Sequence, residues 1–319
     1  MAKLLLKTIM LLEIDKKPFT QFILILSLCL ISTIVFSIIG TGLAALLFGF
    51  NTLEINNLGS PDLIEGMKLI QLCTAIGLFV VPPLVYGPFT SKQPLQKLGL
   101  KTFPKQINYA LILGLMIALT PFLSWIIELN ANMVLPNFLS SIEQWMRESE
   151  QNAEELTKAF LTFNGVGSLL YVLVIVAIVP AIGEELLFRG VLQKIFINWT
   201  NKPHLGIWIS AILFSALHMQ FFGFFPRMLL GLLFGYVFYW SKSLWLPVLG
   251  HFINNGTVVM VAYFFPEELE NMDKSMFDGG ENFVLLTILS LIVSGVIFFL
   301  LWKLNAENKN DQSPLRSLS

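Results

Sequence analysis

The sequence is poor in charged residues, cysteine and histidine. Of its 319 residues 13% are charged and 55% are hydrophobic, and it has 2 cysteines and 3 histidines. Soluble domains carry about twice this charged fraction, so a soluble globular protein is not expected. Cys29 and Cys73 have no Cys-x-x-Cys spacing, which argues against a disulfide framework or a zinc ribbon. The formal net charge of −1 gives no reason to expect a nucleic-acid partner.

Long apolar runs are abundant instead. A run of about 20 apolar residues can cross a ~30 Å hydrocarbon core as a helix. Eight such runs are present, at 20–48, 69–90, 107–128, 165–188, 205–224, 227–241, 243–265 and 282–303. The predicted fold class is therefore all-α, a polytopic membrane protein of about eight transmembrane helices surrounded by membrane lipid. Residues 1–19 are expected to form a cytoplasmic or interfacial segment, 20–304 a single membrane domain and 305–319 a cytoplasmic tail.

The basic residues predict the orientation of these helices. Lys and Arg are retained on the cytoplasmic side of a membrane. With the N terminus inside, most of them fall in cytoplasmic segments, and the exceptions are Lys68, Arg147, Lys158, Arg227 and Lys274. Both termini are therefore predicted to be cytoplasmic. Without an organelle signal, a bacterial inner (plasma) membrane is expected. The outer segment 133–162 is either an amphipathic surface helix or a solvated connector.

One intramembrane segment combines opposite charges. The stretch "AIVPAIGEELLFRG", residues 177–190, places Glu184, Glu185 and Arg189 at the end of an apolar run. Residues four apart share a helix face, so Glu185 can pair with Arg189 while Glu184 points elsewhere. Charges at such depth are costly and are by default functional. Glu184 is thus a candidate general base, unless both acids simply lie solvated at the membrane rim.

Two of the three histidines also lie inside apolar runs. His218 follows Phe214 by four residues in "FSALHMQFF", and His251 precedes Asn255 by four residues in "LPVLGHFINNGT". Each spacing puts both members of a pair on one helix face. A single intramembrane histidine often serves only as an interhelical hydrogen-bonding residue. Polar faces on three helices, however, predict one shared polar cavity, expected between the cytoplasmic rim and the middle of the membrane.

These three motifs resemble those of a known family. "EELLFRG", "FSALH" and "HFINN" are similar to the Glu-Glu-x-x-x-Arg, Phe-x-x-x-His and His-x-x-x-Asn motifs of the CAAX-protease and bacteriocin-processing (Abi) family, over about residues 165–260. The resemblance implies an intramembrane endopeptidase that hydrolyses a peptide bond of a membrane-associated protein or peptide. It implies catalytic roles for Glu184, His218, His251 and Asn255, and supporting roles for Glu185, Arg189 and Phe214.

The chemistry of these groups leaves two mechanisms open. In the favoured one no cofactor is used: Glu184 and His218 activate a water, and His251 and Asn255 donate to the oxyanion. In the alternative, His218, His251 and Glu184 bind zinc, as in metalloproteases. Two other functional classes also remain, a non-catalytic membrane scaffold or bacteriocin-immunity protein of the same fold, and a proton-coupled transporter.

Overall fold

The protein is a bundle of helices. The computed structural model describes residues 17–49, 60–267 and 282–306, and these ranges contain helices and turns but no strand. Six helical segments in them are long and apolar enough to cross a membrane: Pro18–Phe48, Pro61–Thr90, Gln106–Ala131, Val166–Thr200, Phe221–Ser241 and Phe283–Ala306. The prediction of an all-α polytopic membrane protein is confirmed, whereas the number of eight spans is not.

The two remaining predicted spans are not among these six, one because of its length and the other because of its polarity. Helix α11, Pro203–Ala216, has 14 residues, and at 1.5 Å per residue this is about 21 Å, less than a ~30 Å hydrocarbon core. Helix α13, Trp245–Phe264, has 20 residues and sufficient length. It carries His251, Asn254 and Asn255, however, and these polar side chains make it less apolar than the six spanning segments.

The remaining helices and helical turns have the following bounds. The α-helices are α2 (Pro18–Phe48), α3 (Pro61–Ala75), α4 (Val81–Thr90), α5 (Pro94–Lys97), α6 (Gln106–Ala131), α7 (Ser140–Phe160), α8 (Val166–Val172), α9 (Val179–Glu185), α10 (Gln193–Thr200), α12 (Phe224–Ser241) and α15 (Phe283–Ala306). The described ranges also contain the π-helical turns η2 (Ile76–Val80), η4 (Leu173–Ile178) and η5 (Leu186–Leu192) and the 3₁₀ turns η3 (Asn137–Leu139) and η6 (Phe221–Gly223). Helices α2, α3, α5 and α11 begin with proline, whose missing N–H costs nothing at that position.

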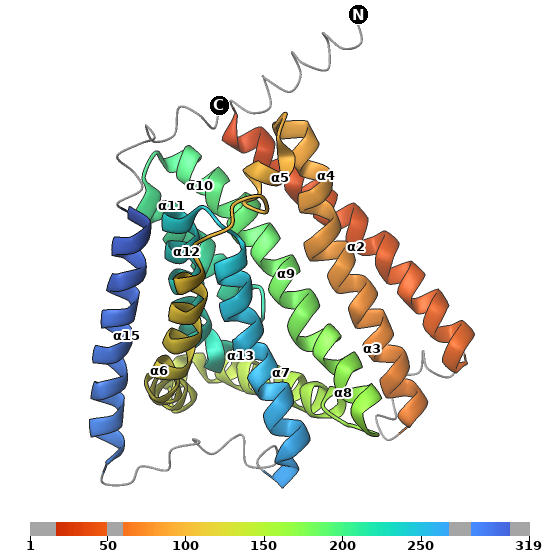
Figure 1. Ribbon diagram of the computed structural model, residues 1–319. Coiled ribbons are helices and arrows are strands. Elements are labelled where there is room, and N and C mark those ends of the chain that lie inside the picture. The colour runs from red at the N-terminus through yellow and green to blue at the C-terminus, as the bar shows by residue number, and fades with distance from the viewer. Residues whose placement is uncertain (1–16, 50–59, 268–281, 307–319) are drawn as a thin grey trace, which may run out of the picture.

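The long helices run roughly side by side, with α2 at one edge and α15 at the other (Figure 1). Helix α2 packs on α3, α15 packs on α6, and α9 and α13 lie between these pairs. The predicted segment at 1–19 and the tail at 305–319 fall almost wholly outside the described residues.

The α10–α11 hairpin is held by a left-handed residue and a glycine. Asn201, with φ 52°, ends α10 in a conformation that Asn adopts more readily than most residues. At Gly206 a Cβ atom would lie 2.5 Å from the backbone N of Ile197. The two helix backbones can therefore approach this closely only because residue 206 has no side chain.

Helix α7 lies across one end of the bundle (Figure 1). Segment 133–162 thus contains a helix, and the apolar side chains of Phe138, just before it, and Ile142, within it, are exposed. The choice between an amphipathic surface helix and a solvated connector stays a prediction. Glu143 accepts hydrogen bonds from Arg147 and from the backbone N–H of Leu135, and these two donors lower the pKa of the Glu143 carboxyl. The helix is thus tied to the loop that precedes it.

Candidate active site

The segment that carries the acidic pair is longer than predicted. Helices α8, α9 and α10 with η4 and η5 form one continuous helical segment, Val166–Thr200, of 35 residues. The sequence predicted a span ending at residue 188, and that boundary is wrong. The charges at Glu184, Glu185 and Arg189 do not end the helix, because all three side chains are buried against other helices.

Glu185 and Arg189 form the predicted i, i+4 ion pair. The Arg189 Nη1 to Glu185 Oε1 distance is 3.0 Å, and the side chains are 1% and 0% exposed. Arg189 Nη2 also donates to the carbonyl oxygen of Gly231 at 3.2 Å, and its guanidinium lies 4.7 Å from the ring centre of Phe214. A buried pair with these additional contacts joins η5 to α12 and keeps the charge on Glu185 fully compensated.

The two histidines present the same nitrogen to Glu184. His251 Nδ1 lies 2.9 Å from Glu185 Oε1, and His218 Nδ1 lies 2.8 Å from the carbonyl oxygen of Phe214. A carboxylate and a carbonyl oxygen only accept hydrogen bonds, so each Nδ1 carries the proton that it donates. In the neutral imidazoles, Nε2 is then unprotonated and is free to accept.

Glu184 lies between these two Nε2 atoms. Its Oε2 is 3.8 Å from Nε2 of His251 and 4.0 Å from Nε2 of His218, and among the described residues this buried oxygen has no hydrogen-bond partner. Three acceptor atoms therefore converge at distances too long for direct hydrogen bonds. Such an arrangement suits a water molecule, which can donate to two of the three atoms, or a metal cation, which all three could bind.

The separations favour water over zinc. A water at about 2.8 Å from each acceptor would see neighbouring acceptors at roughly 90°. Zinc at its usual distance of about 2.0–2.1 Å would need ligand–zinc–ligand angles of roughly 130–180°, whereas tetrahedral ligands lie about 3.3 Å apart. The donor types, two imidazoles and a carboxylate, are suitable for zinc, but their spacing in this structure does not fit it. Across the described ranges, no three His, Cys, Asp or Glu side chains form a metal-binding group.

Aromatic rings enclose this cluster. The Phe214 ring makes edge contacts with His218 and His251, at centroid distances of 5.0 and 6.0 Å. The Phe234 ring stacks on His251 at 5.9 Å. Phe214 was predicted from its motif, but Phe234 was missed, because nothing in the spacing of α12 distinguishes it from other apolar residues. These rings lower the local polarity and strengthen the electrostatic interactions of the cluster.

Asn255 lies on α13 but reaches a different group. Its Nδ2 donates to the carbonyl oxygen of Val176 in η4 at 3.1 Å, and its Oδ1 accepts from Asn254. The residue four positions after Val176 is Pro180, which has no N–H to donate to this carbonyl. Asn255 supplies this carbonyl with a side-chain donor. One N–H of its amide remains for a second acceptor.

The cluster lies near the middle of the long helical segment that carries Glu184. Glu184 lies 18 residues from the start and 16 from the end of Val166–Thr200, which is about 24–27 Å from each end. The expectation of a cavity between the cytoplasmic rim and the middle of the membrane stays a prediction. The third histidine, His204, contacts the hydroxyl of Tyr236 on the surface and takes no part in the cluster.

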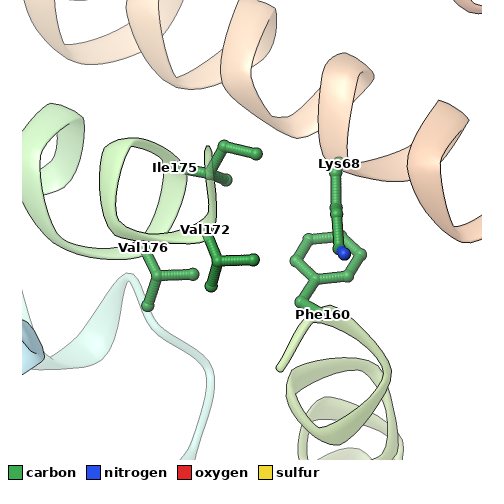
Figure 2. A pocket seen from close by; sticks show the side chains of 5 residues that line it. All are labelled: Lys68, Phe160, Val172, Ile175 and Val176. Carbon is green, nitrogen blue, oxygen red and sulfur yellow. The ribbon is translucent and has the colours of Figure 1, made fainter. Parts of the chain in front are cut away.

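A small cavity elsewhere shares no residue with this cluster. It leaves no room for a water molecule and lies among α3, the end of α7 and the segment that carries η4 (Figure 2). Its lining is apolar except for Lys68, whose Nζ pairs with Glu65 at 2.8 Å and is also 3.5 Å from the carbonyl oxygen of Thr162. A single compensated charge gives this cavity no catalytic group.

Comparisons with known proteins agree with the motifs. Residues 166–257 match the family described as Type II CAAX prenyl endopeptidase Rce1-like. The uncharacterized protein YpbD of Bacillus subtilis (strain 168) is 31% identical over 85 residues, which are 25% of this chain and 40% of that protein. The chain thus spans less than half the length of this relative. No solved structure matches. The matched segment contains Glu184, both intramembrane histidines and Asn255, and the match over this part of the chain supports its resemblance to the CAAX-protease and bacteriocin-processing family.

Proposed function

We propose that this protein is an intramembrane endopeptidase that hydrolyses a peptide bond of a membrane-associated protein or peptide with a water activated by Glu184. The observation that carries the proposal is the convergence of Glu184 Oε2 with Nε2 of His218 and His251, at 4.0 and 3.8 Å. The family match supports a peptidase. Neither a scaffold nor an immunity protein would need three acceptors arranged around one point inside the membrane.

In the proposed reaction, Glu184 is the general base. A water donates one proton toward Glu184 Oε2 and the other toward Nε2 of His218. Glu184 removes the first proton as the water oxygen bonds to the carbonyl carbon of the substrate, and the carbonyl electrons move to its oxygen. Glu184 then gives that proton to the amide nitrogen as the carbon–nitrogen bond breaks. The products are a carboxylic acid and an amine, and the base is restored.

His251 is assigned to the oxyanion. Its Nδ1–H is held by Glu185, which fixes the orientation of the ring and the direction of Nε2. Imidazolium would present Nε2–H to the developing oxygen, and such donors typically contribute 10²–10³ in rate, or about 3–4 kcal/mol. Asn255 is assigned to the same oxygen through its second amide N–H, while its first N–H fixes the backbone of η4. Zinc held by His218, His251 and Glu184 is the competing assignment.

Membrane proteomics tests the proposal. Membranes with the wild-type chain would be compared with membranes carrying Glu184→Gln, and new N and C termini would be sought by mass spectrometry. Glu148→Gln, an equally conservative change on the exposed surface of α7, is the matched control. The proposal expects cleaved termini with wild type and Glu148→Gln and none with Glu184→Gln. Identical termini in all three would favour a scaffold.

A further inference from the structure

The turn that carries His218 lies at the α7 end of the bundle. His218 is three residues before Phe221, whose ring lies 5.1 Å from that of Trp145 on α7. Glu150 of α7 accepts a hydrogen bond from the backbone N–H of Phe222 at 3.2 Å, and Arg147 lies 4.7 Å from the ring of Phe222. The surface helix and the turn after α11 are therefore in direct contact.

The lysine-rich segments lie at the opposite end. Lys194 donates to the backbone carbonyl of Lys97, and the backbone N–H of Leu244, two residues after Lys242, donates to the carbonyl of Gly99. Near the end of α15, two residues after Lys303, Asn305 donates to Asn108 at the start of α6. Contacts between separate elements thus gather these basic residues on one face of the bundle.

Helix α6 extends from one end of the bundle to the other, so its length gives their separation. Asn108 lies beside Asn305 at the lysine-rich end, whereas Asn130 donates to the carbonyl oxygen of Phe221 at 3.2 Å. The 22 residues between them correspond to about 33 Å of helix. A hydrocarbon core is about 30 Å thick. The turn that follows His218 therefore lies across the membrane from the lysine-rich face.

This turn is also the open side of the cluster. The side chain of His218 is 31% exposed, whereas those of His251 and Glu184 are 7% and 11% exposed. The flanking residues Leu217 and Met219 are 64% and 53% exposed. Exposure increases from Glu184 toward the α7 end. His251 and Glu184 are shielded instead by Arg189, Phe214 and Phe234.

We propose that the Glu184 cluster is reached from the α7 side, so that its substrate is a peptide segment presented on the non-cytoplasmic face of the membrane. This inference deepens the proposed peptidase function and rests on it, because only an enzyme would have a substrate at this site. The assignment of the face follows from the retention of lysine on the cytoplasmic side. The turn 217–220 and the adjoining part of α7 would form the entrance.

Thiol labelling tests this access without any assay of activity. In a Cys29→Ala, Cys73→Ala background, single cysteines would replace Met219 at the entrance, Ser141 on α7 and Gln96 on α5, all exposed positions. Intact right-side-out cells would be treated with a membrane-impermeant maleimide before and after the membrane is opened. We expect labelling at 219 and 141 in intact cells, and at 96 only after opening.

Three results would overturn the proposal. If Met219→Cys is labelled under the same conditions as Gln96→Cys, and not as Ser141→Cys, the entrance lies on the lysine-rich side. If Met219→Cys and Ser141→Cys are both labelled only after the membrane is opened, the entrance lies in the cytoplasm. Absence of labelling at 219 in opened membranes would show that the turn admits no water. If the labelling is as expected but cleavage is never detected, the access is right and the peptidase function is wrong.

Discussion

The buried pair of Glu185 and Arg189 allows a quantitative prediction. Glu185→Gln removes the negative charge but keeps an acceptor oxygen for Arg189 and His251. Arg189 cannot move to water, because it is 1% exposed and is held by Gly231 and Phe214. Breaking a buried pair by removing one partner typically costs 3–5 kcal/mol, and the retained amide oxygen places the expected loss near the lower limit, about 3 kcal/mol.

A double variant separates lost charge pairing from lost packing. Glu185→Gln combined with Arg189→Met replaces the pair by neutral groups of similar volume, which is often close to neutral in stability. We therefore expect the double variant to recover most of the ~3 kcal/mol lost in Glu185→Gln, with a coupling energy of at least about 2 kcal/mol. Glu148→Gln, on the exposed face of α7, should change stability by less than about 0.5 kcal/mol.

The assay is equilibrium unfolding in mixed detergent micelles, followed by tryptophan fluorescence. The free energy of unfolding would be compared for the wild type, both single variants and the double variant. Two outcomes would refute the reasoning: Glu185→Gln as stable as Glu148→Gln, or a double variant whose loss is the sum of the two single losses. Either would mean that the pair is not buried and mutually compensating in the folded protein.

Three further predictions concern the close approach of α11 to α10 at Gly206, the side chain of Asn255 and the spacing of the Glu184 cluster. Gly206→Ala should lower thermal stability, because its Cβ would lie 2.5 Å from the backbone N of Ile197, whereas Gly295→Ala, with nothing within 4 Å, should not. A melting curve of Gly206→Ala equal to that of Gly295→Ala would contradict this. Asn255→Ala should reduce kcat by about 10²–10³, the usual effect of losing an oxyanion donor; unchanged kcat at equal folded protein would remove Asn255 from the site. Turnover by the purified protein should survive removal of zinc by chelation, and elemental analysis of the same preparation should show less than stoichiometric metal; activity lost on chelation and restored by zinc would reverse this assignment.

The sequence predicted the helical class, but it misplaced several boundaries. Charge normally ends a transmembrane run, so residue 188 was taken as an end and Lys68 was placed outside the second span. In the structure Arg189 pairs with Glu185 and Lys68 pairs with Glu65, and both charges lie within helices. Charges compensated inside the protein do not obey a rule that is based on their transfer from water.

The contacts of the site residues could be predicted only in part. The i, i+4 rule correctly paired Glu185 with Arg189 and left Glu184 to face other helices. The same rule has no information on contacts between distant segments. Glu185 contacts His251 across 66 positions, and Asn255 contacts Val176 across 79. These contacts determine which nitrogen of His251 is protonated and what Asn255 supports, and they depend on how α13 packs on η4 and α9.

The role of Glu184 as the base that activates water is tested most directly by turnover of one purified cleavage substrate. A peptide that spans a cleavage site found in membranes would be incubated with wild-type protein, Glu184→Gln and Glu148→Gln at equal amounts of folded protein. We expect kcat of Glu184→Gln to fall by about 10²–10⁴, the usual contribution of a general base, while Glu148→Gln stays at the wild-type rate. A Glu184→Gln rate within tenfold of wild type would contradict the assignment of Glu184 as the base.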